Sequence, residues 1–139
     1  MTKVLITRPN FDVVTSYFHF WGGQILRLAE EKGFSVMDLE GSKATCEKVD
    51  SYLARNHPSL VLLNGHGSPS LIAGHKNEPL VDVRSAGKLK ETIVYTISCS
   101  AAKELGPECI RKGGIAFIGY EEDFGFTVDL TRDANPAKD

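Results

Sequence analysis

Five short apolar runs alternate with longer helical stretches along this chain, and that alternation limits its fold more than any other feature. Four of the runs are almost continuously apolar, as expected for strands that helices cover on both faces. The second run alternates apolar and polar residues, so we expect it nearer the edge of the sheet. The predicted strands are Lys3–Thr7, Phe34–Leu39, Ser59–Leu63, Thr92–Ile97 and Ile115–Gly119.

The stretches between these strands have apolar residues at helical spacing, apart from a small polar-tipped hairpin after the third strand. Strands that alternate with helices favour a parallel sheet with right-handed crossovers. We therefore predict an α/β fold, a three-layer α/β/α sandwich whose mostly parallel sheet has about five strands. A single domain should span residues 1–139, with a polar, frayed tail at about 132–139. The predicted helices are about Asp12–Lys32, Ala44–Asn56, Arg84–Glu91 and Ala101–Lys112, and the hairpin spans Leu71–Asp82.

Composition and charge argue against two classes of partner. Sixteen basic and eighteen acidic side chains give a net charge of −2, which does not suit a surface that neutralises nucleic-acid phosphates. No apolar run approaches the roughly 20 residues that span a bilayer, and the first residues lack the pattern of a signal peptide, so we expect no membrane partner. Three cysteines are a sparse, odd set that cannot form a disulfide framework, which favours a reducing, cytoplasmic location.

The two most reactive side chains each follow a predicted strand. His66 lies just after the third strand, within Asn64-Gly-His-Gly67, and Cys99 lies just after the fourth. Because chemistry gathers at the carboxyl ends of parallel strands, both side chains should project from one edge of the sheet. An imidazole can take the proton of a thiol, and later protonate a leaving amine. The N–H groups of Gly67 and Cys99 could stabilise an oxyanion there, so the sequence favours acyl transfer.

Three segments resemble the caspase-like (clan CD) cysteine peptidases, namely Leu62–Gly67, Tyr95–Ala102 and Gly113–Tyr120. In that family an apolar strand ends in His-Gly, and a later apolar strand ends in a small residue and Cys. Papain-like enzymes have the Cys first. Here Cys99 follows His66 by 33 residues, fewer than the roughly 50 of caspases, which favours the gingipain and CHAT-type branch.

The resemblance implies a cysteine endopeptidase that hydrolyses peptide bonds through a Cys-His dyad and a thioester. Cys99 would be the nucleophile and His66 its proton-transfer partner, and the backbone amides of Gly67 and Cys99 would form the oxyanion hole. The substrate would be a protein or peptide. Ile97 departs from the family, because metacaspases have an acidic residue two positions before the Cys and caspases have a Gln. No third residue that would orient His66 is evident in the sequence.

Four charged residues are candidates for binding the P1 side chain, which precedes the cleaved bond. Arg8 follows the first strand, and by resemblance to caspases it could bind an acidic P1 residue. Asp12, together with Glu121 and Asp123 after the fifth strand, would instead favour Arg or Lys, as in gingipain, clostripain and separase. We favour a basic P1 residue. No cofactor is expected, although the same acidic run could bind Ca²⁺, and no His or Cys pair has the spacing of zinc ligands.

Two other functions remain open from the sequence. A catalytically incomplete caspase-like domain could act as a binding or oligomerisation module, with an ordinary Cys99. A flavodoxin-like or receiver-like domain would need a phosphate loop or an acidic pocket after the first strand, and Arg8-Pro9-Asn10 fits neither. The family fold normally has a sixth strand after the fifth. Without it, we expect a homodimer through the open edge or pairing with a missing C-terminal segment.

Overall fold

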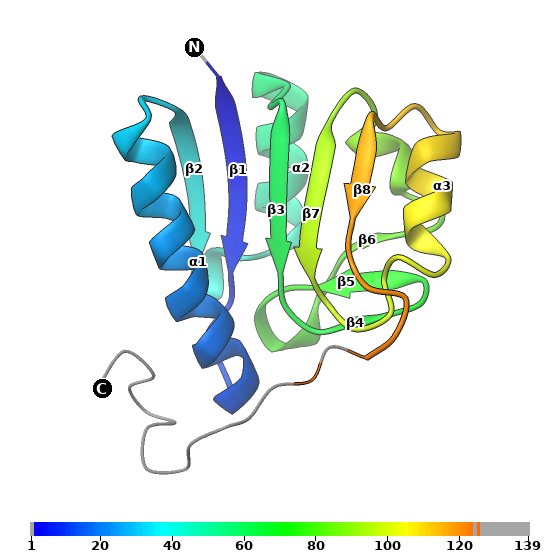
Figure 1. The fold of residues 1–139 in the computed structure, drawn as a ribbon, viewed down its shortest axis with the longest axis horizontal. Helices are drawn as coiled ribbons and strands as arrows, with labels where there is room; N and C mark the ends of the chain where they lie inside the picture. The colour runs from blue at the N-terminus through cyan, green and yellow to red at the C-terminus, as the bar shows by residue number, and fades with distance from the viewer. Residues whose placement is uncertain (1, 124, 126–139) are drawn as a thin grey trace.

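In the computed structural model, five parallel strands form one sheet in the order β2-β1-β3-β7-β8 (Figure 1). The structure describes residues 2–123 and 125. The alternating strand β2 lies at the edge of the sheet, as predicted, and the continuously apolar β1 and β3 lie inside it. The strands are β1 (Lys3–Arg8), β2 (Ser35–Glu40), β3 (Leu60–Asn64), β7 (Ile93–Ile97) and β8 (Ala116–Ile118).

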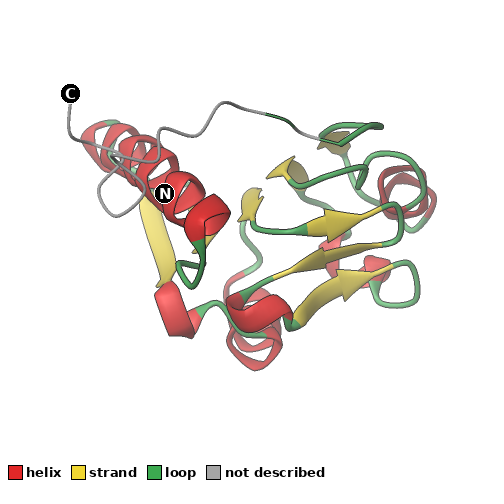
Figure 2. Cartoon of the chain, turned by 90° about the horizontal axis from the view of Figure 1, so that it is seen from below, coloured by secondary structure: helices red, strands yellow, loops and turns green. Residues whose placement is uncertain are grey.

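Helices lie on both faces of this sheet, which confirms the predicted three-layer α/β/α architecture. Helix α1 (Val13–Glu31) covers one face, and α2 (Cys46–Asn56) covers the other (Figure 2). Helix α3 (Leu105–Arg111) shares an apolar cluster with α2, so it lies on the same side as α2. The cluster under α1 is smaller and centres on the inner strands β1 and β3. Apolar burial on both faces is the main force that holds the layers together.

The predicted hairpin is confirmed as β5 and β6, and it belongs to a second, antiparallel sheet of three strands in the order β4-β5-β6. Its strands are β4 (Gly67–Ser68), β5 (Leu71–Ala73) and β6 (Pro79–Asp82), with a 3₁₀ turn, η2 (His75–Asn77), between the last two. Strands β5 and β6 pack into the cluster on the α2 side of the main sheet. Strand β4 begins directly after His66, so this small sheet fixes the backbone of the predicted site.

Two predicted helices are shorter in the structure. The region Arg84–Glu91 contains a 3₁₀ turn, η3 (Ala86–Leu89), because Asp82 accepts the backbone N–H groups of both Arg84 and Ser85 in a turn of its own. Helix α3 begins at Leu105, whereas the prediction began at Ala101. The residues before it form turns, and the Leu105 N–H donates to the carbonyl of Pro69 at 2.9 Å.

A third 3₁₀ turn, η1 (Gly41–Lys43), connects β2 to α2. No helix in the described ranges is both long and apolar enough to cross a membrane. The predicted tail at 132–139 lies outside the described residues.

Candidate active site

His66 and Cys99 occupy equivalent positions on two neighbouring parallel strands. Asn64, the last residue of β3, pairs in register with Ile97, the last residue of β7. His66 and Cys99 each lie two residues beyond that pair, at the carboxyl edge of the sheet, and both are half-buried. The predicted placement of the thiol and the imidazole on one edge of the sheet is therefore confirmed. Ile97, which departs from the family pattern, is 8% exposed.

Hydrogen bonds from β7 hold the two turns together. The Ser98 hydroxyl, which is fully buried, donates to the carbonyl of Gly65 at 3.0 Å. The Thr96 hydroxyl donates to the carbonyl of Leu63 at 2.6 Å and lies 2.8 Å from the Ser98 oxygen. These buried bonds tie the residue before Cys99 to the residue before His66. Each bond contributes about 1 kcal/mol to the free energy of unfolding, and leaving one of its buried partners unpaired would lower that free energy by more.

Gly67 is the point at which the two turns touch. A Cβ atom at this position would lie 2.7 Å from the Cβ of Ser98 and 3.0 Å from the carbonyl oxygen of Cys99, closer than side chains pack. Only glycine therefore allows this approach without a shift of the backbone. The close contact between the two turns, and not a positive φ angle, therefore accounts for the glycine after His66.

The pairing of β4 with β5 directs the amide of Gly67. Gly67 pairs with Ile72, and the N–H of Ala73 donates to the carbonyl of His66 at 2.8 Å. In an antiparallel ladder this pattern makes Gly67–Ile72 the pair without mutual hydrogen bonds, so the Gly67 N–H points away from β5. The β4–β5 ladder therefore does not use the Gly67 N–H, which is a necessary condition for an oxyanion donor.

Asp12 contacts His66, and this contact corrects the expectation that no third residue orients the imidazole. Nε2 of His66 donates to Oδ2 of Asp12 at 2.7 Å. The other carboxylate oxygen caps helix α1, because Oδ1 accepts the Thr15 N–H at 2.8 Å and the Thr15 hydroxyl at 2.7 Å. The structure thus shows Asp12 bound to the predicted proton-transfer residue. The expectation that Asp12 binds the P1 side chain of the substrate rested on its charge alone.

The charge state of Asp12 determines which nitrogen of His66 is basic. Burial alone would raise the pKa of Asp12, but hydrogen bonds from Thr15 and from His66 outweigh it and hold that pKa below its usual value. Asp12 is therefore ionised at neutral pH and can only accept hydrogen bonds. In the neutral imidazole Nε2 must then carry the proton, which leaves Nδ1 as the nitrogen that can accept one.

Phe11 packs against the same imidazole. Its ring lies 5.9 Å from that of His66 in an edge-on arrangement, and it makes a similar contact at 5.9 Å with His75 on η2. His66 is thus held by a carboxylate and by an aromatic ring, both from the residues that enter α1.

Arg8 does not face the predicted substrate site. Its side chain is buried, and its guanidinium forms a bidentate pair with Asp38, with N–O distances of 2.8 and 2.6 Å. It also donates to the carbonyl of His19 at 3.0 Å and lies 3.6 Å from Glu40. The hydrogen bonds that Arg8 donates to Asp38 raise the pKa of Arg8. With its charge already neutralised by two carboxylates, Arg8 is not supported as the group that binds an acidic P1 residue.

This ion pair also explains the two glycines inside α1. A Cβ atom at Gly22 would lie 2.8 Å from Cδ of Arg8, and one at Gly23 would lie 3.3 Å from its guanidinium. The glycines leave room for the arginine side chain under the helix, and α1 continues through them without a break.

The acidic run after β8 lies against the turn that carries Cys99. The Ser100 N–H donates to the carbonyl of Glu122 at 2.9 Å, and the Ser100 hydroxyl donates to Asp123 at 3.2 Å. Ser100 itself has a φ of 59°, a left-handed conformation that is uncommon outside glycine and is often found at functional sites. Asp123 therefore lies beside the predicted nucleophile, and Glu121, two residues earlier, is exposed. Among the described residues, no group of three His, Cys, Asp or Glu side chains could hold a metal ion.

The other two cysteines lie away from this edge. Cys109 on α3 is 1% exposed, and burial raises the pKa of its thiol to about 11. Burial also raises the pKa of Cys46, at the start of α2, although Lys88 opposes the shift. Thiols with raised pKa values are poor nucleophiles at neutral pH.

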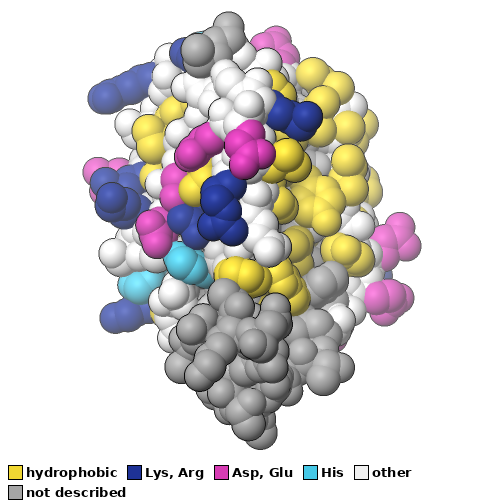
Figure 3. All heavy atoms as spheres, turned by 60° about the vertical axis from the view of Figure 1, so that its left-hand side comes forward, with side chains coloured by type: hydrophobic (Ala, Val, Ile, Leu, Met, Phe, Trp, Pro, Cys, Tyr) yellow, Lys and Arg dark blue, Asp and Glu magenta, His cyan; other side chains and the backbone are white. Residues whose placement is uncertain are grey.

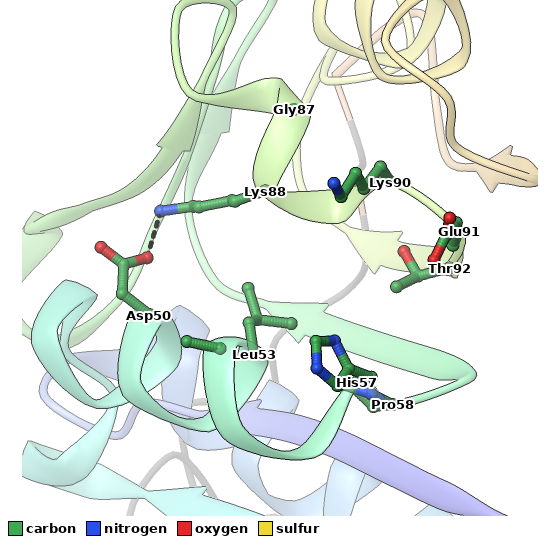
Figure 4. A pocket seen from close by; sticks show the side chains of 10 residues that line it. Asp50, Leu53, His57, Pro58, Gly87, Lys88, Lys90, Glu91 and Thr92 are labelled. Carbon is green, nitrogen blue, oxygen red and sulfur yellow. Dashed lines mark hydrogen bonds and ion pairs between the residues drawn. The ribbon is translucent and has the colours of Figure 1, made fainter.

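A hollow of about 340 Å³ lies at the opposite end of the sheet (Figure 4). Leu53 of α2 and His57, the residue after that helix, line one side of it. Lys88 of η3 and Lys90, the residue after that turn, line the other. Lys88 is paired with Asp50 at 2.8 Å. The hollow adjoins the amino end of β7, so it is separate from the edge that carries Cys99. No cysteine is among its lining residues.

Neither a comparison with models of protein families nor a comparison with curated protein sequences gives a match.

Proposed function

We propose that this protein is a cysteine endopeptidase in which Cys99 is the nucleophile and His66 transfers the proton. The observation that supports this most is the register of the two strands, which gives His66 and Cys99 equivalent positions past Asn64 and Ile97. The contact of His66 with Asp12 adds a third group, which would orient the imidazole and stabilise its charged form. The resemblance to caspase-like peptidases is consistent with the same roles.

In the proposed reaction, Nδ1 of His66 takes the proton of the Cys99 thiol, and the thiolate attacks the carbonyl carbon of the scissile peptide bond. The carbonyl oxygen becomes an oxyanion, which the amides of Gly67 and Cys99 would bind. The C–N bond then breaks, the amine leaves with the proton from His66, and a thioester to Cys99 remains. Water attacks this thioester while His66 takes its proton, and the Cys99 thiolate leaves, then regains that proton from His66.

We propose a basic P1 residue as the preferred substrate feature. Asp123 lies beside Ser100, next to the nucleophile, and Glu121 is an exposed carboxylate in the same run. Arg8, the candidate for an acidic P1 residue, has its charge paired with Asp38. Exposed charges of this kind contribute up to about 1 kcal/mol, so the preference should weaken at high salt.

We also propose a cytoplasmic location. All three cysteines are free thiols, which is the usual state of cysteines in a reducing compartment.

A peptide library with Arg, Lys, Asp or Glu at P1 tests the proposal directly. Cleavage after Arg and Lys should be seen with the unmodified protein and lost in Cys99→Ala. The matched control Cys46→Ala should retain it, because Cys46 lies away from the site. In Glu121→Gln, KM for the Arg substrates should rise by up to about fivefold, whereas Glu30→Gln at the far end of α1 should change nothing. Cleavage that survives in Cys99→Ala would contradict the proposed nucleophile.

A further inference from the structure

Two rows of apolar residues cross the main sheet on the face that α1 covers. Residues in register on neighbouring parallel strands point to the same face, so each row can be followed strand by strand from β1 to β8. All eight side chains are apolar. One row is Val4, Leu60, Ile93 and Ala116, and the other is Ile6, Leu62, Tyr95 and Ile118.

Helix α1 covers the part of this face that is formed by β2, β1 and β3. In the second row Ile6 is 0% exposed and Leu62 is 6% exposed, but Ile118 on β8 is 53% exposed. In the first row Val4 is fully buried and Ile93 is 37% exposed. The side chains of these rows on β7 and β8 are therefore more exposed than those on β1. We call the surface formed by Leu60, Ile93, Tyr95, Ala116 and Ile118 the β7–β8 face.

The space-filling view agrees with this difference in exposure. Apolar side chains gather on the right of Figure 3, the side that faces the viewer in Figure 1, while charged side chains gather on the left. Contiguous exposed apolar surface of this kind usually marks a site of contact, because leaving it in water costs free energy.

The sequence after Asp123 has the pattern of a segment that could cover this face. Phe124, Phe126, Val128 and Leu130 alternate with Gly125, Thr127 and Asp129. In an extended conformation, that period of two gives one entirely apolar side. Seven extended residues span about 23 Å, which is longer than a five-residue strand such as β7.

The described residues before this segment lie at the carboxyl edge of the main sheet, close to the end of β7. The bonds from Ser100 to Glu122 and Asp123, and the bond from the Ala102 N–H to the carbonyl of Tyr120 at 2.9 Å, fix the chain after β8 at the carboxyl edge. Residues 124–130 are therefore attached to the described chain at the edge where β7 ends.

We propose that residues 124–130 of this chain dock on the β7–β8 face, with Phe126 and Val128 against Tyr95 and Ile118. Docking would continue the apolar cover that α1 begins. It would also anchor the acidic run that contacts Ser100. The inference does not depend on peptidase activity, so it can be tested in Cys99→Ala.

Amide hydrogen exchange of the full chain, read by mass spectrometry, tests the docking. In Cys99→Ala, amides of residues 124–130 should exchange at least about tenfold more slowly than in a synthetic peptide of that sequence. Ile118→Ser should bring them to within about twofold of the peptide. Ile110→Ser is the matched control, because Ile110 is also an exposed isoleucine (45%) but lies on α3. It should leave the protection intact.

Val128→Ser provides a second test that leaves the sheet unchanged, and it should also remove the protection. Exchange in the parent protein as fast as in the free peptide would overturn the proposal. Protection that persists in both Ile118→Ser and Val128→Ser would also overturn it. Protection that appears only at concentrations where light scattering gives a dimer mass would show that a second copy of the chain covers the face instead.

Discussion

Nε2 of His66 donates a 2.7 Å hydrogen bond to the carboxylate of Asp12, which also caps helix α1. The two residues are 54 positions apart in the sequence and meet because β1 and β3 are neighbours in the sheet. Through this carboxylate, the start of α1 and the imidazole are parts of one hydrogen-bonded unit. Asp12 therefore has two roles, to cap α1 and to bind the imidazole of His66, and different substitutions can separate them.

Asp12→Asn should lower the rate of peptide hydrolysis without unfolding the protein. Asn caps helices as well as Asp, so the bond from the Thr15 N–H survives. The charge that stabilises the His66 imidazolium is lost, and a hydrogen bond to a charged group contributes about 1.5–3 kcal/mol, or roughly 10- to 100-fold in kcat. Steady-state kinetics together with thermal melting would check this. An equal loss of melting temperature in Asp12→Asn and Asp12→Ala would argue that Asp12 acts through the helix alone.

The lowered pKa of Asp12 also predicts how stability depends on pH. Because the pKa is lower in the folded state than in the unfolded chain, Asp12 stabilises the fold above the unfolded value of about 4. That contribution should disappear as the pH falls through the folded pKa. Urea unfolding should therefore show Asp12→Asn less stable than the parent at pH 6, with a smaller difference at pH 3. A stability difference of the same size at both pH values would contradict the assignment.

Gly67→Ala should disturb the contact between the turns that carry His66 and Cys99. The added methyl would meet the Cβ of Ser98 and the carbonyl of Cys99, so one turn must shift, at a cost of about 1–3 kcal/mol in the free energy of unfolding. The rate of hydrolysis should fall by more than the loss of folded protein explains, because the shift would also move the proposed oxyanion donor at Gly67. Gly87→Ala is the matched control, since its nearest contact would be Cδ of Lys112 at 3.7 Å. If the two variants behave alike in unfolding and hydrolysis assays, the close approach at Gly67 is not essential.

Arg8→Met should destabilise the fold and leave the preference at P1 unchanged. The substitution removes a bidentate bond to Asp38 and leaves that carboxylate partly buried, which we expect to cost about 2–3 kcal/mol. Arg27→Met removes an exposed arginine from α1 and should cost little. Denaturant unfolding and the same peptide library would measure both effects. A loss of cleavage after acidic residues in Arg8→Met would restore Arg8 as a substrate-binding residue.

The sequence was sufficient to predict the main sheet because its strands are short apolar runs with clear ends. Each of the five predicted strands matches an observed one within about two residues, and the alternating run forms the edge strand β2. Strand β4 could not be predicted in the same way. It has only two residues, Gly67 and Ser68, and it exists because β5 pairs with it. The shortened α3 likewise depends on bonds to Pro69 and Tyr120, which are distant in sequence.

The site was predictable where it depends on sheet topology and was not where it depends on side-chain partners. Two residues that follow adjacent parallel strands must share an edge, so His66 and Cys99 could be placed from the sequence. The charges of Arg8 and Asp12 did not reveal that one pairs with Asp38 and the other with His66. One signal was available for Asp12, because the Asp-x-x-Thr spacing of a capping box places it at the start of α1, next to the end of β1.

The rate of alkylation of each cysteine as a function of pH tests the central claim most directly. Iodoacetamide labelling of the unmodified protein and of His66→Ala can be read separately at Cys46, Cys99 and Cys109 by mass spectrometry. The raised pKa values of Cys46 and Cys109 make these two thiols slow internal references. We predict rapid labelling of Cys99 below pH 7 that is lost in His66→Ala. Labelling of Cys99 that rises only near the ordinary thiol pKa of about 8.5, and is unchanged in His66→Ala, would contradict the proposed dyad.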